Sequence, residues 1–146
     1  MPPPLRGISS MATRQVLADL AIAWQAAGGQ PVTIESVGGV DAAQRVQAGE
    51  ALDVVLLASD AIDKLIASGH AMAQSKVDWV RSSTAVAVPA GASLPDIGSE
   101  AALQTAVLAA PSIGYSTGPS GTALLALFQR WGIAEQLQPR LVQARP

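Results

Sequence analysis

Residues 53–69 read DVVLLASDAIDKLIASG, a short apolar run followed by an amphipathic stretch and a glycine. Asp53–Leu57 is continuously apolar after its first residue, which is typical of a strand buried on both faces of a parallel sheet. Ser59–Asp60 offers N-cap side chains for a helix over Ala61–Ser68, and Gly69 is expected to end that helix. The stretch therefore predicts one strand-and-helix unit of an α/β fold.

The same alternation of short apolar runs and amphipathic stretches continues on both sides of this unit. Such an alternation indicates a parallel sheet covered by helices. The expected strands are Leu5–Ile8, Pro31–Val37, Ser83–Val88, Ser112–Tyr115 and, at the end, Pro139–Val142. The expected helices are Met11–Ala27, a helix from Gly38 and Gly39 through about Ala48, Ser99–Ala109, Ser120–Trp131 and a single turn at Ala134–Leu137.

The segment Pro89–Gly98, which reads PAGASLPDIG, is rich in Pro, Gly and Ala and is the best candidate for a hinge. We therefore expect a first α/β lobe over residues 1–88, a hinge over 89–98 and part of a second α/β lobe over 99–146. The second lobe would hold only one clear strand, so we expect it to be incomplete. A second copy or a complementing fragment would then cover its apolar helix faces, through exchanged elements.

The composition excludes several classes of protein. The 146 residues carry 9 basic and 11 acidic side chains, one histidine and no cysteine. This charge argues against nucleic-acid binding, and the missing cysteines exclude disulfide scaffolds and thiolate metal sites. We expect no metal and no cofactor. No apolar run approaches the roughly 18 residues of a membrane-spanning helix, so we expect no direct membrane insertion.

The N-terminus, Met1–Leu5, has no apolar core of a signal peptide. We therefore expect a periplasmic protein whose leader is absent from this chain, or a cytoplasmic protein if the chain is native as given.

Four turns that follow predicted strands share a composition suited to an anion, at residues 7–10, 36–39, 58–60 and 115–122. Parallel α/β sheets bind ligands at the carboxyl ends of their strands, and each of these turns offers hydroxyls and backbone N–H groups at a helix N-terminus. One such turn taken alone is more often a simple helix cap, but its recurrence favours an anion site. The candidate ligand residues are Ser9, Ser10, Arg14, Gly38, Gly39, Ser59, Tyr115, Ser116, Ser120, Gly121 and Thr122.

Known nucleotide-binding and catalytic patterns are missing from the sequence. Neither GxxxxGK[ST] nor GxGxxG occurs, and no nucleophile is paired with a base. Arg14 lies in the first turns of the predicted helix and could reach a carboxylate, although a solvated surface position is an equal alternative. Tyr115 could lend its hydroxyl to a ligand or could simply be packed at a strand end. We therefore expect no catalytic residue.

The chain resembles the bacterial extracellular solute-binding proteins typified by the periplasmic molybdate-binding protein. The resemblance runs from about Leu5 to about Leu137. It rests on the order of the elements, on the pattern G-E-x-x-D-V formed by Gly49, Glu50, Asp53 and Val54, and on the helix start GPSGTALL at residues 118–125. Members of this family are longer than this chain, which is therefore expected to be a fragment or a short relative.

The resemblance implies a two-lobed fold of the periplasmic-binding-protein type, with parallel-rich sheets flanked by helices and an oxyanion held in the cleft between the lobes. Ser9 or Ser10 matches a ligand serine after the first strand, and residues 116–122 match a ligand segment of the second lobe. The second ligand serine of the family belongs in the turn that here reads Ser36-Val37-Gly38-Gly39. Family members carry a serine beyond Val37, whereas this chain has Gly38 and Gly39 there. Arg14 does not belong to the molybdate pattern and suits a larger carboxylate.

Two functions follow as expectations. The first is a solute-binding protein that captures a small anion, either a molybdate-like oxyanion or a small carboxylate, for ABC import through membrane subunits. The alternative is an isomerase that acts on a tricarboxylic acid such as aconitate, because some relatives are similar to such isomerases. The effector part of a LysR-type regulator shares the architecture, but it would require a helix-turn-helix and a basic surface, which the sequence lacks.

Overall fold

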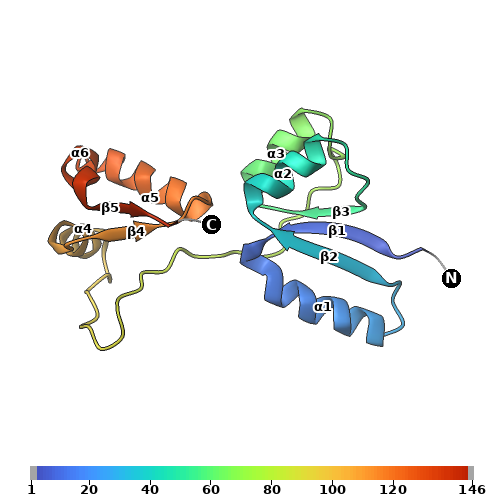
Figure 1. The fold of residues 1–146 in the computed structure, drawn as a ribbon, viewed down its shortest axis with the longest axis horizontal. Coiled ribbons are helices and arrows are strands. Elements are labelled where there is room, and N and C mark those ends of the chain that lie inside the picture. The colour runs from blue at the N-terminus through green and yellow to red at the C-terminus, as the bar shows by residue number, and fades with distance from the viewer. Residues whose placement is uncertain (1–2, 145–146) are drawn as a thin grey trace. The chain divides into compact units, whose positions relative to one another are not determined.

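The computed structural model describes residues 3–144, which divide into two compact units, one ending at Ser82 and the other beginning at Ser83 (Figure 1). We call them unit 1 and unit 2. Unit 1 contains a three-stranded parallel sheet in the order β2-β1-β3, and unit 2 contains a two-stranded parallel sheet, β4-β5. The predicted α/β class, with parallel strands flanked by helices, is confirmed. The lobe and hinge boundaries derived from the sequence remain a prediction.

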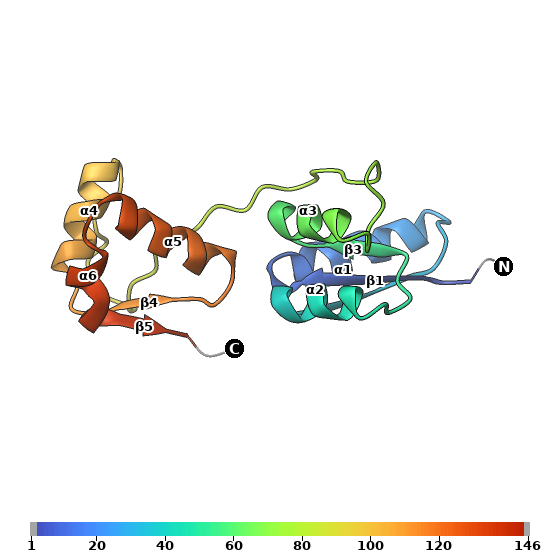
Figure 2. The ribbon, with the colours of Figure 1, turned by 90° about the horizontal axis from the view of Figure 1, so that it is seen from above.

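Unit 1 alternates strands and helices in the expected order. Its elements are β1 (Leu5–Ser10), a 3-10 helix (Met11–Thr13), α1 (Arg14–Ala26), β2 (Val32–Val37), α2 (Gly39–Gln47), β3 (Val54–Leu56) and α3 (Ser59–Ala67). Helix α1 covers one face of the sheet and helices α2 and α3 cover the other (Figures 1 and 2). The core on the second face contains Ile8, Ala42, Val46 and Leu65. Because all three strands are parallel, their carboxyl ends meet at one edge.

From residue 99 onward, unit 2 follows the sequence prediction to within about two residues. Its elements are α4 (Glu100–Ala109), β4 (Ile113–Tyr115), α5 (Pro119–Arg130), α6 (Ala134–Leu137), a 3-10 helix (Gln138–Arg140) and β5 (Leu141–Gln143). Its core is formed by Phe128, Ile133 and Leu137. The Oγ of Ser99 accepts a hydrogen bond of 3.1 Å from the amide of Ala102, so Ser99 caps α4 and is not, as predicted, its first residue.

The strand predicted at Ser83–Val88 is wrong. These residues form no ladder, and all of them except Val88 are exposed. An alternating apolar segment becomes a strand only where a neighbouring strand supplies hydrogen-bond partners. The prediction that Asp53–Leu57 is buried on both faces is also wrong, because β3 lies at the edge of its sheet and Val54 is 37% exposed.

The C-terminus of α3 is as predicted. Gly69 has φ of 77°, a left-handed conformation that glycine adopts without steric cost. Among residues 3–144, no helix combines the length and the apolar character required to cross a membrane.

Candidate anion-binding site

Two serine side chains meet at the carboxyl edge of the unit 1 sheet. Ser9 of β1 is fully buried and pairs in register with Ser36 of β2, and their Oγ atoms are 2.7 Å apart. Ser10 ends β1, and a Cβ atom placed on Gly39 would lie 3.7 Å from the Cβ of Ser10. The structure therefore gathers three of the sequence-predicted residues at one edge. Ser36 was not among them, although the alternation along β2 places it on the same face as Ile34.

The helices that start at this edge have no side-chain cap. The N-caps of α2 and α3 are Gly38 and Ala58, and neither has a side chain that accepts a hydrogen bond from the first-turn amides. The prediction that Ser59 and Asp60 cap α3 is wrong, because both already lie inside the helix. Helix α4 differs, because Ser99 caps it. The first-turn amides of α2 and α3 are therefore free of side-chain acceptors and suit an anion.

Arg14 brings a positive charge to the same part of unit 1. It is the first residue of α1, is exposed, and forms no ion pair with any of residues 3–144. A hollow of about 410 Å³ is lined by Arg14, Ser36, Ile34 and by Met11, Leu17, Ala18 and Ala21. An unpaired guanidinium beside a serine hydroxyl can bind a carboxylate by charge-assisted hydrogen bonds.

The predicted residues of unit 2 gather at the start of α5. The Oγ atoms of Ser116 and Ser120 are 2.7 Å apart, and the N-cap Gly118 has no side chain to accept a hydrogen bond from the first-turn amides of α5. Gly121 is buried, and a Cβ at this position would overlap the carbonyl oxygen of Ser116. The close approach of the Ser116 carbonyl to the start of α5 therefore explains the glycine at position 121.

The remaining two residues predicted in this loop make local contacts. The hydroxyl of Thr122 donates back to the carbonyl of Gly118 at 3.4 Å. Tyr115 is half-buried, and its ring carbon Cδ2 lies 3.2 Å from where a Cβ of Gly121 would stand. The Tyr115 ring therefore packs near the start of α5, and a contact of its hydroxyl with a ligand remains a prediction. That the groups of unit 1 and unit 2 act on one ligand remains a prediction.

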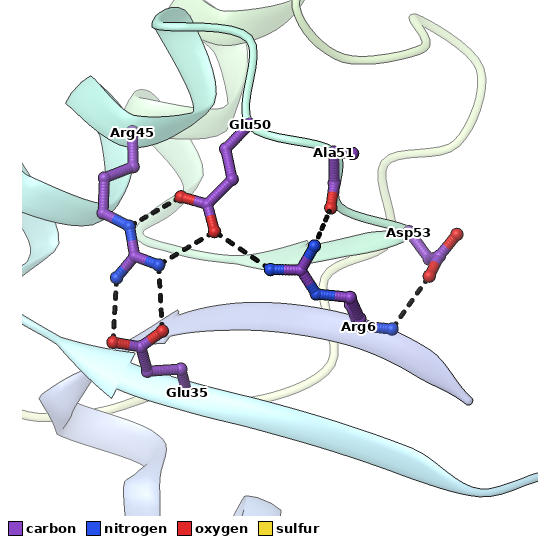
Figure 3. Close-up of polar contacts among 6 residues, drawn as sticks. All are labelled: Arg6, Glu35, Arg45, Glu50, Ala51 and Asp53. Carbon is purple, nitrogen blue, oxygen red and sulfur yellow. Dashed lines mark hydrogen bonds and ion pairs between the residues drawn. The ribbon is translucent and has the colours of Figure 1, made fainter. Parts of the chain in front are cut away.

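The G-E-x-x-D-V pattern belongs to a charged network on unit 1 (Figure 3). Arg45 donates to both carboxylate oxygens of Glu35, at 2.9 Å each, and to those of Glu50, at 2.7 and 2.9 Å. Arg6 adds a 3.3 Å ion pair to Glu50, and its backbone amide donates to the Asp53 carboxylate at 2.8 Å. The hydrogen bonds from Arg45 lower the pKa of both Glu35 and Glu50.

This network has a structural role. It joins β1, β2, α2 and the segment that precedes β3. The carboxylates of Glu35 and Glu50 are both paired with guanidinium groups already. Asp53 extends the pairing of β1 with β3, because its own amide donates to the carbonyl of Arg6 at 2.8 Å. The pattern that carries part of the family resemblance therefore stabilises the fold and does not mark a ligand contact.

The family model of bacterial extracellular solute-binding proteins matches residues 5–146. An aconitate isomerase from a Pseudomonas species is 37% identical over 105 residues, which are 70% of this chain and 40% of the relative. The chain thus spans less than half the length of that relative. The chain belongs to the bacterial extracellular solute-binding protein family.

Proposed function

We propose that the chain binds a small polycarboxylate anion at the carboxyl edge of the unit 1 sheet, as the ligand-capturing part of a periplasmic solute-binding protein that serves an ABC importer. The observation that carries the proposal is the set of donors at this edge. Helices α2 and α3 begin there without side-chain caps, Ser9 and Ser36 bring two hydroxyls together near the carboxyl ends of β1 and β2, and Arg14 supplies an unpaired positive charge. Backbone donors and helix dipoles favour an anion without requiring further cations.

Arg14 favours a carboxylate over a molybdate-like oxyanion. A planar guanidinium matches the two oxygens of a carboxylate in a bidentate pair, whereas hydroxyls and amides alone suffice for a compact tetrahedral ion. The relative named for aconitate, a tricarboxylate, supports the same choice. The departure from the expected second serine, with Gly38 and Gly39 following Val37, also favours a ligand other than the molybdate ion.

Calorimetric titration with aconitate, citrate, molybdate, tungstate, sulfate and phosphate tests the proposal. We expect the tightest binding with a polycarboxylate. Ser10→Ala should weaken that binding by about 1–3 kcal/mol, since a hydroxyl donor to a charged ligand is lost. Arg14→Gln should weaken polycarboxylate binding and leave any molybdate binding unchanged. Arg130→Gln is the matched control, because Arg130 is exposed and already paired with Glu100 at 3.0 Å. Unchanged affinities in both Ser10→Ala and Arg14→Gln would show that the site lies elsewhere.

An isomerase is the second candidate, and the observation that favours it is the 37% identity to the aconitate isomerase. The two functions differ in whether the bound acid is converted. Incubating the chain with one geometric isomer of aconitate and separating the isomers by chromatography decides between them. Conversion that is proportional to protein concentration and lost in Arg14→Gln supports the isomerase. Binding without conversion supports the solute-binding function.

A further inference from the structure

Unit 1 has a second hollow, which includes the start of α3. It encloses about 490 Å³ and is lined by Ser59, Asp78, Trp79, Val80 and Arg81. Ser59 is the first residue of α3, the helix that follows β3. The segment 78–81 therefore passes the uncapped start of α3 and adds its side chains there. Of these five residues, only Ser59 was a sequence-predicted ligand residue.

Arg81 is as unengaged as Arg14. It is exposed and forms no ion pair with any of residues 3–144, although Asp78 lines the same hollow. The two arginines line hollows that include a residue of, or just after, one of the two outer strands of the sheet. Arg14 shares its hollow with Ser36 of β2, and Arg81 shares its hollow with Ser59, which follows β3. Strand β1 lies between those two strands.

The separation of these strands sets the scale of the ligand. Adjacent strands lie about 4.8 Å apart, so β2 and β3 are separated by roughly 10 Å. Arginine side chains are long and flexible enough to bridge several ångströms from each side. Two guanidinium groups placed in this way suit an acid whose carboxylates are separated by a few carbon atoms. They do not suit an oxyanion with all its charge on one centre.

We propose that Arg81 is a second cationic contact for the ligand, binding one carboxylate near the start of α3 while Arg14 binds another near the end of β2. This proposal rests on the proposed polycarboxylate function and adds the requirement for at least two carboxylates. Asp78 then opposes binding, because its negative charge lies in the hollow that receives the carboxylate. Trp79, which is 42% exposed, forms an apolar wall of this hollow.

The experiment compares Arg81→Gln, Asp78→Asn and Arg14→Gln in the full chain by calorimetry with aconitate and succinate, at fixed ionic strength. Arg81→Gln should weaken binding of both acids at least about tenfold, the value of one charge-assisted hydrogen bond. Asp78→Asn should strengthen binding of both. Circular dichroism checks folding, and Arg130→Gln is the control for loss of a positive charge. Tryptophan emission should change on aconitate binding in the parent chain and in Arg130→Gln, but not in Trp79→Phe.

Each outcome decides between the two proposals. If Arg14→Gln weakens aconitate binding while Arg81→Gln and Asp78→Asn bind as the parent does, the role of Arg81 is refuted and the proposed function stands. If the parent binds neither acid, the proposed function fails and the role of Arg81 fails with it. Opposite effects of Arg81→Gln and Asp78→Asn support the role of Arg81 even if one variant is less stable than the parent.

Discussion

The hydroxyl of Ser9 lies 2.7 Å from the hydroxyl of Ser36, between two strands that pair in register at these residues. Ser9 is fully buried and Ser36 is half-buried, so the two hydroxyls differ in access to a ligand. One hydroxyl can donate to the other, and the second proton is then available to an acceptor outside the pair. The pair therefore orients the Ser36 hydroxyl at the edge where α1 begins.

This arrangement predicts different roles for the two serines. Ser9→Ala should reduce the free energy of unfolding by about 1 kcal/mol, because it removes a hydrogen bond between partly buried groups. Ser36→Ala should weaken polycarboxylate binding, and its affinity loss should exceed its effect on stability. Urea denaturation followed by circular dichroism measures the first effect, and calorimetry with aconitate measures the second. Equal affinity losses in the two variants would contradict this division of roles.

A second prediction concerns Gly121 at the start of α5. Gly121→Ala should destabilise unit 2 by about 1–3 kcal/mol, since the added methyl overlaps the Ser116 carbonyl and the loop must move. Gly118→Ala is the matched control, because the nearest atom to its added Cβ, the Ser116 Oγ, is 3.9 Å away and its φ of −83° suits any residue. The measurement is the urea midpoint of each variant. Equal midpoints for the two variants would mean that the loop adjusts freely.

Local signals account for most of the fold that the sequence predicted. Ser99, Gly69 and the turn at Ala134–Leu137 are set by capping, by left-handed backbone and by short apolar spacing, all of which are encoded by neighbouring residues. The strand predicted at Ser83–Val88 failed for the opposite reason. Its alternation is suited to a strand, but pairing depends on a partner that sequence pattern alone cannot identify.

The residues of the candidate site also divide into those that the sequence predicts and those that require the three-dimensional structure. Ser9, Ser10 and Gly39 were predictable, because parallel strands bring their carboxyl ends to one edge whatever the details of packing. Ser36 required the register between β1 and β2. Arg81 required the path of an irregular segment past α3, for which the sequence carries no periodic signal. The sequence therefore misses residues whose place depends on strand register or on the path of an irregular segment.

A third prediction concerns Arg140, which completes the end of α4. Its guanidinium donates to the carbonyls of Leu108 and Ala110, at 2.8 and 2.7 Å. Arg140→Met keeps the apolar stem and should destabilise unit 2 by about 1–3 kcal/mol, because two helix-end carbonyls lose a charged donor. Arg130→Met, which breaks an exposed ion pair, should cost at most about 1 kcal/mol. The comparison of their urea midpoints is the test, and a larger loss in Arg130→Met would refute the assignment.

The fourth prediction is the pH dependence of unit 1. Hydrogen bonds from Arg45 lower the pKa of Glu35 and Glu50 below the ordinary value of 4.5 in the folded chain. The folded state therefore binds fewer protons than the unfolded state over this range, so stability rises with pH there. The contribution of these carboxylates is fully present above the ordinary value, and it is lost as the pH falls through the lower folded values.

Urea denaturation between pH 7 and pH 3 measures this dependence, and Arg45→Met is the variant that isolates it. In Arg45→Met both carboxylates lose the donor that lowers their pKa, so the decline in stability below the ordinary carboxyl pKa should be shallower than in the parent. Arg130→Met controls for general effects of acid, because its partner Glu100 lies in unit 2. The pKa of Glu100 is lowered mainly by the hydrogen bond from the Trp131 indole and to a smaller extent by Arg130. Parallel pH profiles for the parent and Arg45→Met would show that the network of Arg45, Glu35 and Glu50 contributes no stability that depends on ionisation.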